Sequence, residues 1–267
     1  MATALITGGT SGIGAEFARQ LAAAGYDLVL VARDEARLAA VAERLHSLSG
    51  IQVETVAADL SDRADVARVA ARLEDASRPI DMLVNNAGFG VRASLTDPDT
   101  AVHDSAFEVM CRAILVLGGA AGRSMRGRGG TIINISSLQS FLATGSYGAI
   151  KAWVTAYSQG LAVELRGTGV KVTAVLPGWV RTEWHERAGV RRASLPSWMW
   201  TEPELVVKVA LRDAARGRVV SIPSVRYRVL GWFARHLPMR TIRWISAAIS
   251  SSRTTEGSEH PVMKAES

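Results

Sequence analysis

The chain has 267 residues, of which 48% are hydrophobic, so it can bury a substantial core and global disorder is excluded. Its one cysteine, Cys111, excludes an intrachain disulfide and a cysteine-rich zinc site, and we expect no metal site. The net charge is +6, no run reaches eighteen apolar residues, and the start MATALITGG lacks a secretory pattern, so we expect a cytoplasmic protein.

Short β-rich segments alternate with helical patterns through the first two-thirds of the chain. The spacing of apolar residues predicts strands at 3–7, 27–32, 51–58, 81–86, 130–136 and 171–177. Between them lie helical periods such as Phe17, Leu21 and Ala24. This alternation predicts right-handed βαβ units, and therefore an α/β fold with a doubly wound parallel sheet and helices on both faces.

The first predicted strand runs through a glycine-rich turn into a helix. Gly8, Gly12 and Gly14 let the backbone turn tightly and approach a ligand closely. The free N–H groups and the positive end of the helix would attract a pyrophosphate. An ordinary glycine-rich turn without a ligand remains an alternative, because a lone glycine pattern is a weak signal.

Five motifs in order carry a family resemblance. TGGTSGIG (7–14), NNAG (85–88), NISS (134–137), Tyr147-x-x-x-Lys151 and PGWVRT (177–182) resemble the signatures of the short-chain dehydrogenase/reductase family. The resemblance covers residues 2–182 and implies one Rossmann-type domain with seven parallel strands. It also implies an NAD(P)-dependent enzyme, a carbonyl or alcohol substrate, and a homodimer or homotetramer.

The same resemblance implies which residues contact the cofactor. Asp59 and Leu60 would flank the adenine, and Thr182 would lie near the nicotinamide carboxamide. The remaining cofactor contacts implied are Gly8, Thr10, Ser11, Gly12, Ile13, Gly14, Asn86, Ala87, Gly88, Tyr147, Lys151, Pro177, Gly178 and Val180.

The end of the second strand favours NADP over NAD. An acid there would bind the ribose 2′-hydroxyl and repel a 2′-phosphate, but the chain has Ala32 followed by Arg33. A guanidinium can bind phosphate through two hydrogen bonds. The alternative is that Arg33 caps the next helix or pairs with Asp34 or Glu35 on the surface.

Tyr147 and Lys151 are one helical turn apart and therefore share a helix face. A tyrosine has an ordinary pKa of about 10, and a nearby ammonium would lower it. The resemblance implies that Tyr147 is the general acid in reduction and the base in oxidation. It also implies that Lys151 lowers the pKa of Tyr147 and binds the ribose, while Ser137 bonds the substrate oxygen.

Two features depart from the family pattern. Ser137 and Ser136 precede Tyr147 by only ten and eleven residues, so the connecting loop is shorter than usual. Met110 stands where the family has an asparagine that supports a proton-relay water. Because a thioether donates no hydrogen bond, we expect slower or rerouted proton transfer; plain core packing is the alternative. Asn134 lies too far along the chain to be an obvious substitute.

The segment 178–200 is predicted to be a lid over the substrate. It contains Trp179, Trp184, Trp198, Met199 and Trp200, which favour a lipophilic or ring-bearing substrate, unless these side chains only pack the lid. His185 is more simply read as incidental. A helix at 204–215 and a strand at 218–223 would complete a catalytic domain of residues 1–223.

The rest of the chain is predicted to be a basic amphipathic extension (224–253) and a flexible tail (254–267). Residues 214–255 contain no acid and eight arginines, and two helical patterns flank Pro238. Segment 225–249 would dock on a second subunit, on its own domain, or on an anionic membrane surface. We expect no nucleic-acid binding. A regulatory or scaffold protein that binds the cofactor with little turnover is the alternative function.

Overall fold

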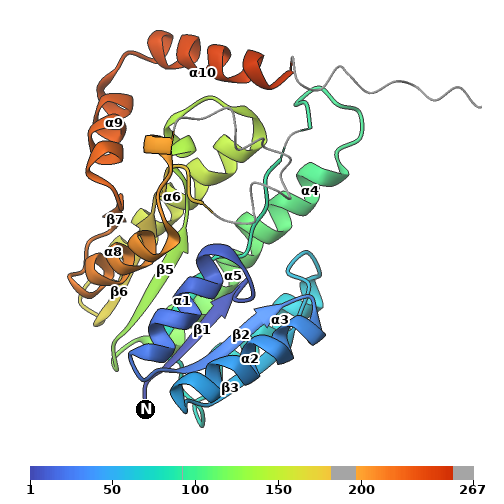
Figure 1. The fold of residues 1–267 in the computed structure, drawn as a ribbon, viewed down its shortest axis with the longest axis vertical. Coiled ribbons are helices and arrows are strands. Elements are labelled where there is room, and N and C mark those ends of the chain that lie inside the picture. Colours follow the sequence, from blue (N-terminus) through green and yellow to red (C-terminus); the bar gives the residue numbers. More distant parts are fainter. Residues whose placement is uncertain (92, 182–196, 255–267) are drawn as a thin grey trace, which may run out of the picture.

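The structure is a computed structural model that describes residues 1–91, 93–181 and 197–254, with side chains described as far as residue 247. Its centre is a seven-stranded parallel sheet in the order β3-β2-β1-β4-β5-β6-β7 (Figure 1). The strands are β1 (Thr3–Thr7), β2 (Asp27–Ala32), β3 (Val53–Ala57), β4 (Met82–Asn85), β5 (Gly130–Ile135), β6 (Val170–Val175) and β7 (Val220–Ser221). The predicted fold class is confirmed, and the predicted strands at 51–58 and 218–223 are shorter than expected.

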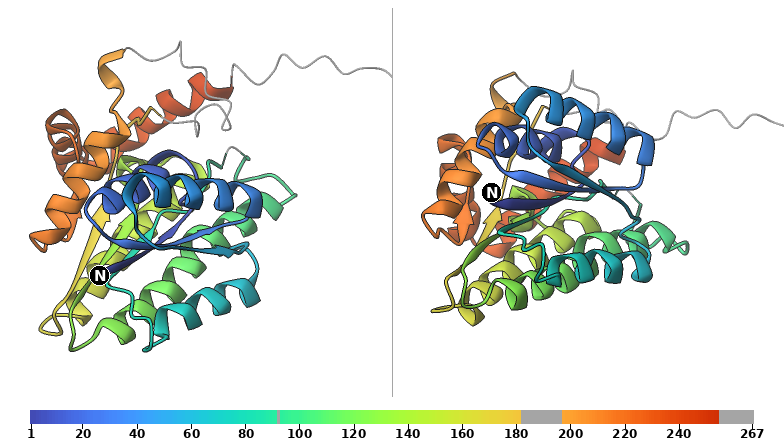
Figure 2. Two further views of the ribbon diagram at one scale, coloured as in Figure 1. Left: turned by 60° about the horizontal axis from the view of Figure 1, so that its bottom comes forward. Right: turned by 90° about the horizontal axis from the view of Figure 1, so that it is seen from below.

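Helices cover both faces of the sheet (Figure 2). One face carries α1 (Gly12–Ala23), α2 (Glu35–Ser49) and α8 (Pro203–Ala215). The opposite face carries α3 (Arg63–Glu74), α4 (Ala101–Phe107), the π-helix η1 (Glu108–Arg112), α5 (Ala113–Met125) and α6 (Gly145–Glu164). The remaining helices described are the 3₁₀-helices η2 (Leu138–Phe141) and η4 (Ser197–Met199), α9 (Val225–His236) and α10 (Met239–Thr254).

Strand β2 illustrates why its sequence is apolar on both sides. Leu28 and Leu30 pack into the core under α1 and α2, whereas Val29 and Val31 pack into the core under α3 and α5. All four side chains are buried, as expected for a central parallel strand covered on both faces. Because successive side chains of a strand point to opposite faces of the sheet, β2 contributes to both cores.

The continuous helical run from α4 through η1 to α5 belongs to this packing. By length and composition alone, Ala101–Met125 could cross a membrane, but more than half of its apolar window is buried inside the domain. Its C-terminal half packs against α3 in the second core. We therefore assign it as a core helix of the fold.

Helices α9 and α10 extend the domain at the carboxyl edge of the sheet (Figure 1). Helix α9 ends at His236 and α10 begins at Met239, so the break between them falls at Pro238, as the sequence predicted. Ser246 of α10 accepts a hydrogen bond from the backbone N–H of Ala143 at 2.9 Å, and Arg235 lies over the ring of Phe141. The segment thus docks on its own domain.

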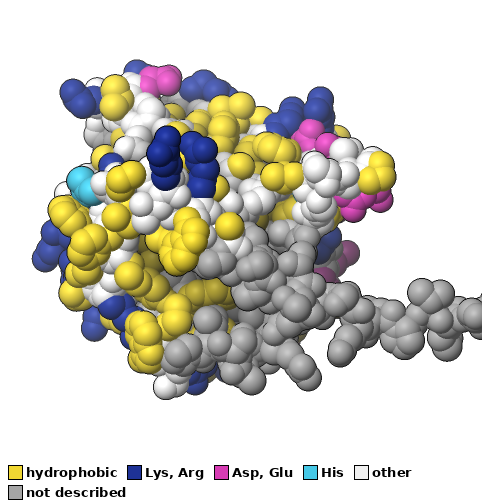
Figure 3. Space-filling view, turned by 90° about the horizontal axis from the view of Figure 1, so that it is seen from above, with side chains coloured by type: hydrophobic (Ala, Val, Ile, Leu, Met, Phe, Trp, Pro, Cys, Tyr) yellow, Lys and Arg dark blue, Asp and Glu magenta, His cyan; other side chains and the backbone are white. Residues whose placement is uncertain are grey.

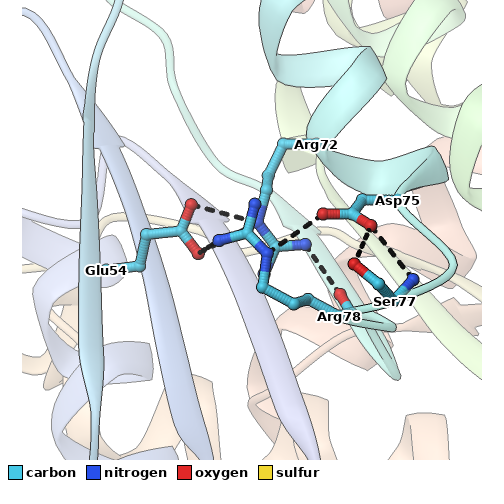
Figure 4. Close-up of polar contacts among 5 residues, drawn as sticks. All are labelled: Glu54, Arg72, Asp75, Ser77 and Arg78. Carbon is cyan, nitrogen blue, oxygen red and sulfur yellow. Dashed lines mark hydrogen bonds and ion pairs between the residues drawn. The ribbon is translucent and has the colours of Figure 1, made fainter.

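Strand β3 lies at one edge of the sheet and is held by a group of charged side chains (Figure 4). The Arg72 guanidinium of α3 donates to both oxygens of Glu54 on β3, at 3.0 and 2.9 Å, and to the backbone carbonyl of Arg78. Arg78 in turn bonds Glu54 and Asp75. Because Arg72 is mostly buried, its loss would leave the Glu54 carboxylate and the Arg78 carbonyl without these hydrogen-bond donors.

Arg72→Met is expected to lower the free energy of unfolding by about 1–2 kcal/mol, since it removes charge-assisted hydrogen bonds but keeps the apolar stem. Chemical denaturation followed by circular dichroism measures this change. Arg44→Met is the matched control, because Arg44 is an exposed arginine of α2 with no ion pair among the described residues. Equal stability of the two variants would contradict the assigned role of Arg72.

Candidate active site

A cavity of about 980 Å³ opens at the carboxyl ends of the strands. It extends from the glycine turn, past the ends of β2 and β4, to the start of α6 and on to α9 and α10. Of the residues predicted from the sequence, those that line it are Gly8, Thr10, Ser11, Gly12, Ile13, Arg33, Asp59, Leu60, Asn86, Ala87, Gly88, Ser137, Tyr147, Lys151, Pro177, Gly178 and Val180. Gly14 packs behind the turn, and Thr182 lies outside the described residues.

The glycine turn forms a cradle at the start of α1. The Gly8 N–H donates to the carbonyl of Val31 at 2.8 Å, which holds the turn against β2. A Cβ added to Gly14 would lie 2.2 Å from the Gly8 carbonyl oxygen, so no larger residue fits there. Ser11, the N-cap residue, makes no side-chain capping bond, so its hydroxyl does not occupy the positive end of the helix.

Asn86 fastens this cradle to the end of β4. Its side-chain amide donates to the carbonyls of Thr7 and Gly8, at 3.0 and 3.2 Å. The Thr7 hydroxyl accepts from the backbone N–H groups of Asn86 and Ala87. These hydrogen bonds therefore fix the glycine turn after β1 and the loop after β4 relative to each other, and both loops would contact a dinucleotide.

The end of β2 presents positive charge to the cavity. Arg33 and Arg37 both line it, and Arg33 is exposed. Asp34 accepts from the backbone N–H of Arg37 as the N-cap of α2, and among the described residues neither Asp34 nor Glu35 forms an ion pair with Arg33. The surface-pairing alternative for Arg33 is therefore not what this structure contains. Arg37 was missed from the sequence, because Arg33 precedes the start of α2 and helical spacing does not relate the two residues.

Asp59 faces the same end of the cavity from the end of β3. Its carboxylate accepts hydrogen bonds from the N–H and the hydroxyl of Ser61, at 2.9 and 2.7 Å. These bonds, helped by the positive charge of Arg33, hold the pKa of Asp59 below its usual range. The carboxylate is thus oriented and ionised at neutral pH.

Ser137, Tyr147 and Lys151 come together where β5 ends and α6 begins. The Tyr147 hydroxyl is hydrogen-bonded to Ser137. The Lys151 ammonium donates to the carbonyl of Ile135 at 2.9 Å and lies 5.5 Å from the centre of the Tyr147 ring. Both tyrosine and lysine line the cavity, so the predicted trio shares one site.

The structure distinguishes between the two adjacent serines. The Ser136 hydroxyl is buried and bonds the Lys151 carbonyl and the Thr155 hydroxyl, at 2.7 and 2.8 Å. It therefore ties β5 to α6. The Ser137 hydroxyl contacts Tyr147 and accepts from the backbone N–H of Gln139, so it is the serine available to a substrate.

The pKa of Tyr147 differs from our expectation. Burial raises it to about 12 in the protein without cofactor, and the hydrogen bond from Ser137 offsets this only in part. Burial also lowers the pKa of Lys151 to about 8. Desolvation outweighs the hydrogen bond from Ser137, so Tyr147 is a neutral phenol at pH 7, and Lys151 remains mostly charged.

Met110 lies within the π-helix η1 and is completely buried. A Cβ built on Gly88 would lie 2.9 Å from the Met110 sulfur and 3.8 Å from the Lys151 ammonium nitrogen, so Gly88, Met110 and Lys151 meet at one point. Met110 packs with Ala106, Cys111 and Ile150. Asn134 is not a substitute, because its amide is buried between Asn85 and Ser158.

The substrate side of the cavity has a mainly apolar wall. Tyr227 of α9 packs on Gly178, where an added Cβ would lie 2.3 Å from the tyrosine ring, and its hydroxyl donates to the Met199 carbonyl. The apolar or aromatic residues on this wall are Phe141, Leu142, Trp179, Met199, Tyr227, Leu230, Phe233, Leu237, Ile242 and Ile245. The contribution of α9 and α10 was missed from the sequence, because nothing local indicates which surface they cover.

Part of the predicted lid can be described. Trp179 and Trp200 meet edge to face with ring centres 6.1 Å apart, and Trp198 is exposed. Trp184 and His185 lie outside the described residues. Among the described residues no group of three or more His, Cys, Asp or Glu side chains is placed to hold a metal ion.

The fold and the site define a Rossmann-type oxidoreductase of the NAD(P)-dependent kind. Residues 2–192 match the family model described as short chain dehydrogenase, and the chain belongs to that family. An uncharacterized oxidoreductase of Staphylococcus saprophyticus is 38% identical over 183 residues, which cover 67% of this chain and 78% of that protein.

Two solved structures resemble the whole chain. A short-chain dehydrogenase from Sphingobium yanoikuyae in complex with NADPH is 36% identical, with a TM-score of 0.79 over 100% of this chain and 99% of that one. A bulky-bulky ketone specific alcohol dehydrogenase from Comamonas testosteroni is 31% identical, with a TM-score of 0.75 over 100% of this chain and 97% of that one.

The buried ammonium predicts a pH dependence of stability. The pKa of Lys151 falls from 10.5 to about 8 on folding, so between these values the unfolded chain binds more protons than the folded one. The contribution of Lys151 to the free energy of unfolding should therefore rise with pH across this window, by an amount on the order of 3 kcal/mol. Burial of Cys111, which raises the pKa of that thiol from 9.0 to about 11, acts in the opposite direction above about pH 9, and burial of Tyr147 and Tyr157 does so above about pH 10, so the comparison with a variant isolates the lysine.

In Lys151→Met this rise should be absent. Urea denaturation at intervals between pH 7 and 10 compares the variant with the wild type, and Lys208→Met, which removes an exposed lysine of α8, serves as the control. Parallel curves for the wild type and Lys151→Met would show that the ammonium is not buried as the structure has it.

Proposed function

We propose that the protein is an NADP-dependent oxidoreductase that interconverts a carbonyl and an alcohol on a bulky, lipophilic small molecule. The observation that carries this proposal is a single cavity joining the glycine cradle, the Ser137–Tyr147–Lys151 trio and an apolar wall. A dinucleotide and a substrate would meet at the trio if both occupied this cavity.

The residues present fit a dinucleotide. The start of α1 has no side-chain cap, and a Cβ at Gly14 would close the cradle, so the turn suits a pyrophosphate. Arg33 and Arg37 would bind a 2′-phosphate, and Ala32 leaves no carboxylate there to repel it. The NADPH complex of the Sphingobium relative supports the same cofactor.

The bound nicotinamide would supply or accept the hydride. In the reducing direction, the Tyr147 hydroxyl donates a proton to the carbonyl oxygen of the substrate, and Ser137 holds that oxygen by a hydrogen bond. The raised pKa of Tyr147 suits this direction, because the phenol carries its proton at neutral pH. The positive charge of Lys151 stabilises the phenolate left after transfer.

The apolar wall supports a bulky, lipophilic substrate. Helices α9 and α10 and the residue that follows α9 contribute Leu230, Phe233, Leu237, Ile242 and Ile245 to the side of the cavity away from the glycine cradle. Burying an apolar group against such side chains is favourable, and few polar atoms compete. The ketone specificity of the Comamonas relative is consistent with this substrate class.

Met110 favours a second candidate function, a cofactor-binding regulator with little turnover. A thioether beside Lys151 cannot hold a relay water as an amide can, so the proton lost by Tyr147 is replaced less readily. If this limits the rate, Met110→Asn raises turnover, whereas an enzyme with a different proton route gains nothing from it.

Arg33→Ala should weaken NADPH binding by about 10- to 100-fold and leave NADH binding almost unchanged, since the charged hydrogen bonds to the 2′-phosphate are lost. Fluorescence titration with each cofactor measures both constants. Arg44→Ala is the control for a change in net charge. Equal losses for NADPH and NADH would reject a role for Arg33 in cofactor choice.

Tyr147→Phe should reduce turnover by about 100- to 10,000-fold while NADPH still binds, because only the proton donor is lost. NADPH absorbance is followed with a panel of bulky ketones, aldehydes and steroids. Tyr157→Phe is the control, since the Tyr157 ring stacks on Trp153 and its hydroxyl bonds Leu115. Undiminished turnover in Tyr147→Phe would refute the assignment, and wild type inert on every substrate would favour the regulator.

A further inference from the structure

We propose that the exposed face of α9 and α10 binds the surface of an anionic lipid bilayer. This face consists of Val225, Arg228, Val229, Leu230, Trp232, Phe233, Arg235, Met239, Arg240, Arg243 and Trp244, and is called the basic aromatic face below. All of these residues are exposed in the folded protein, although Arg235 also lies over the ring of Phe141, and Leu230 and Phe233 also line the cavity.

The first observation is the exposure of large apolar side chains. Trp244 is 73% exposed, Met239 61% and Trp232 57%. The helices dock on the domain through other residues, chiefly Tyr227, Gly231 and Ile242. Trp232 and Trp244 are therefore not needed to pack these helices on the domain. Large apolar side chains that are exposed together on one face indicate an interaction site.

The second observation is charge. Arg228, Arg235, Arg240 and Arg243 are exposed, and among the described residues none of them forms an ion pair. No acid occurs between residues 214 and 255. Figure 3 shows hydrophobic side chains gathered over this end of the molecule with Lys and Arg side chains among them, while acidic side chains lie toward the margins.

This combination fits a bilayer better than a second copy of the chain. In a twofold symmetric contact the same patch meets itself, so the arginines would face arginines with no acid of the segment between them. An anionic bilayer supplies the opposite charge. Tryptophan side chains favour the headgroup region, and amphipathic helices with basic residues lie in that plane.

The third observation is continuity with the cavity. Leu230 and Phe233 both line the cavity and are each 49% exposed, so its apolar wall reaches the basic aromatic face. A lipophilic molecule dissolved in the bilayer would meet this edge first. That consequence rests on the proposed function, whereas the membrane contact itself does not.

Vesicle flotation of the full-length protein tests the proposal. One set of vesicles is phosphatidylcholine alone, and the other contains added phosphatidylglycerol. The wild type should bind the anionic vesicles and lose affinity as salt is raised. Arg240→Ser/Arg243→Ser should weaken this binding roughly 25-fold, about fivefold per arginine. Trp232→Ser/Trp244→Ser should weaken it as well, because the aromatic anchors are lost.

Matched double variants serve as controls. Arg44→Ser/Arg166→Ser removes two exposed arginines near the opposite edge of the sheet, and Leu48→Ser/Leu95→Ser removes two exposed apolar side chains elsewhere. Both should bind anionic vesicles like the wild type. Thermal melting and NADPH titration of each variant establish that it is folded, independently of turnover.

The proposal is wrong if the wild type prefers neither vesicle at low salt, or if the Arg240/Arg243 variant binds as well as its control. Sedimentation velocity tests whether a second copy of the chain, and not a bilayer, covers this face. If Trp232→Ser/Trp244→Ser dissociates an oligomer and no vesicle binds the wild type, the basic aromatic face is a subunit interface. Vesicle binding without NADPH turnover would support the membrane contact while leaving the proposed function unsupported.

Discussion

A buried lysine ammonium is the feature on which the active site depends. The Lys151 side chain extends from α6 into the interior of the domain and donates a hydrogen bond to the carbonyl of Ile135 at the end of β5. Burial opposes this arrangement, because it disfavours the charged form, and it lowers the pKa of Lys151 to about 8. The Ser136 hydroxyl bonds the Lys151 backbone carbonyl and the Thr155 hydroxyl, and these bonds tie β5 to α6.

The position of Lys151 organises the groups around it. Tyr147 lies one turn earlier, so its ring is placed over the ammonium and its hydroxyl faces Ser137. The glycine cradle is positioned separately, through the amide of Asn86. The Tyr147 hydroxyl and the glycine cradle are thus placed by different elements, helix α6 and the turn between β1 and α1, at the carboxyl edge of one parallel sheet.

The substrate side is built by the C-terminal helices. The loop between Ser137 and Tyr147 is short, and it holds only the 3₁₀-helix η2. Gly231 of α9 approaches Leu138 and Phe141 in this loop, and Tyr227 packs on Gly178. The helices therefore form a wall of the cavity beside this loop. They line the cavity and also carry the basic aromatic face, and Leu230 and Phe233 belong to both.

The local pattern of the sequence by itself determined the parallel sheet, the glycine cradle and the Tyr147–Lys151 pair, because strand periodicity, tight turns and helical spacing depend on near neighbours. It could not foresee that Arg37 lines the cavity, or that α9 and α10 form part of the cavity wall. The local sequence pattern also did not predict that burial raises the pKa of Tyr147. Burial and docking are sums over contacts between distant segments, and only the tertiary structure brings those segments together.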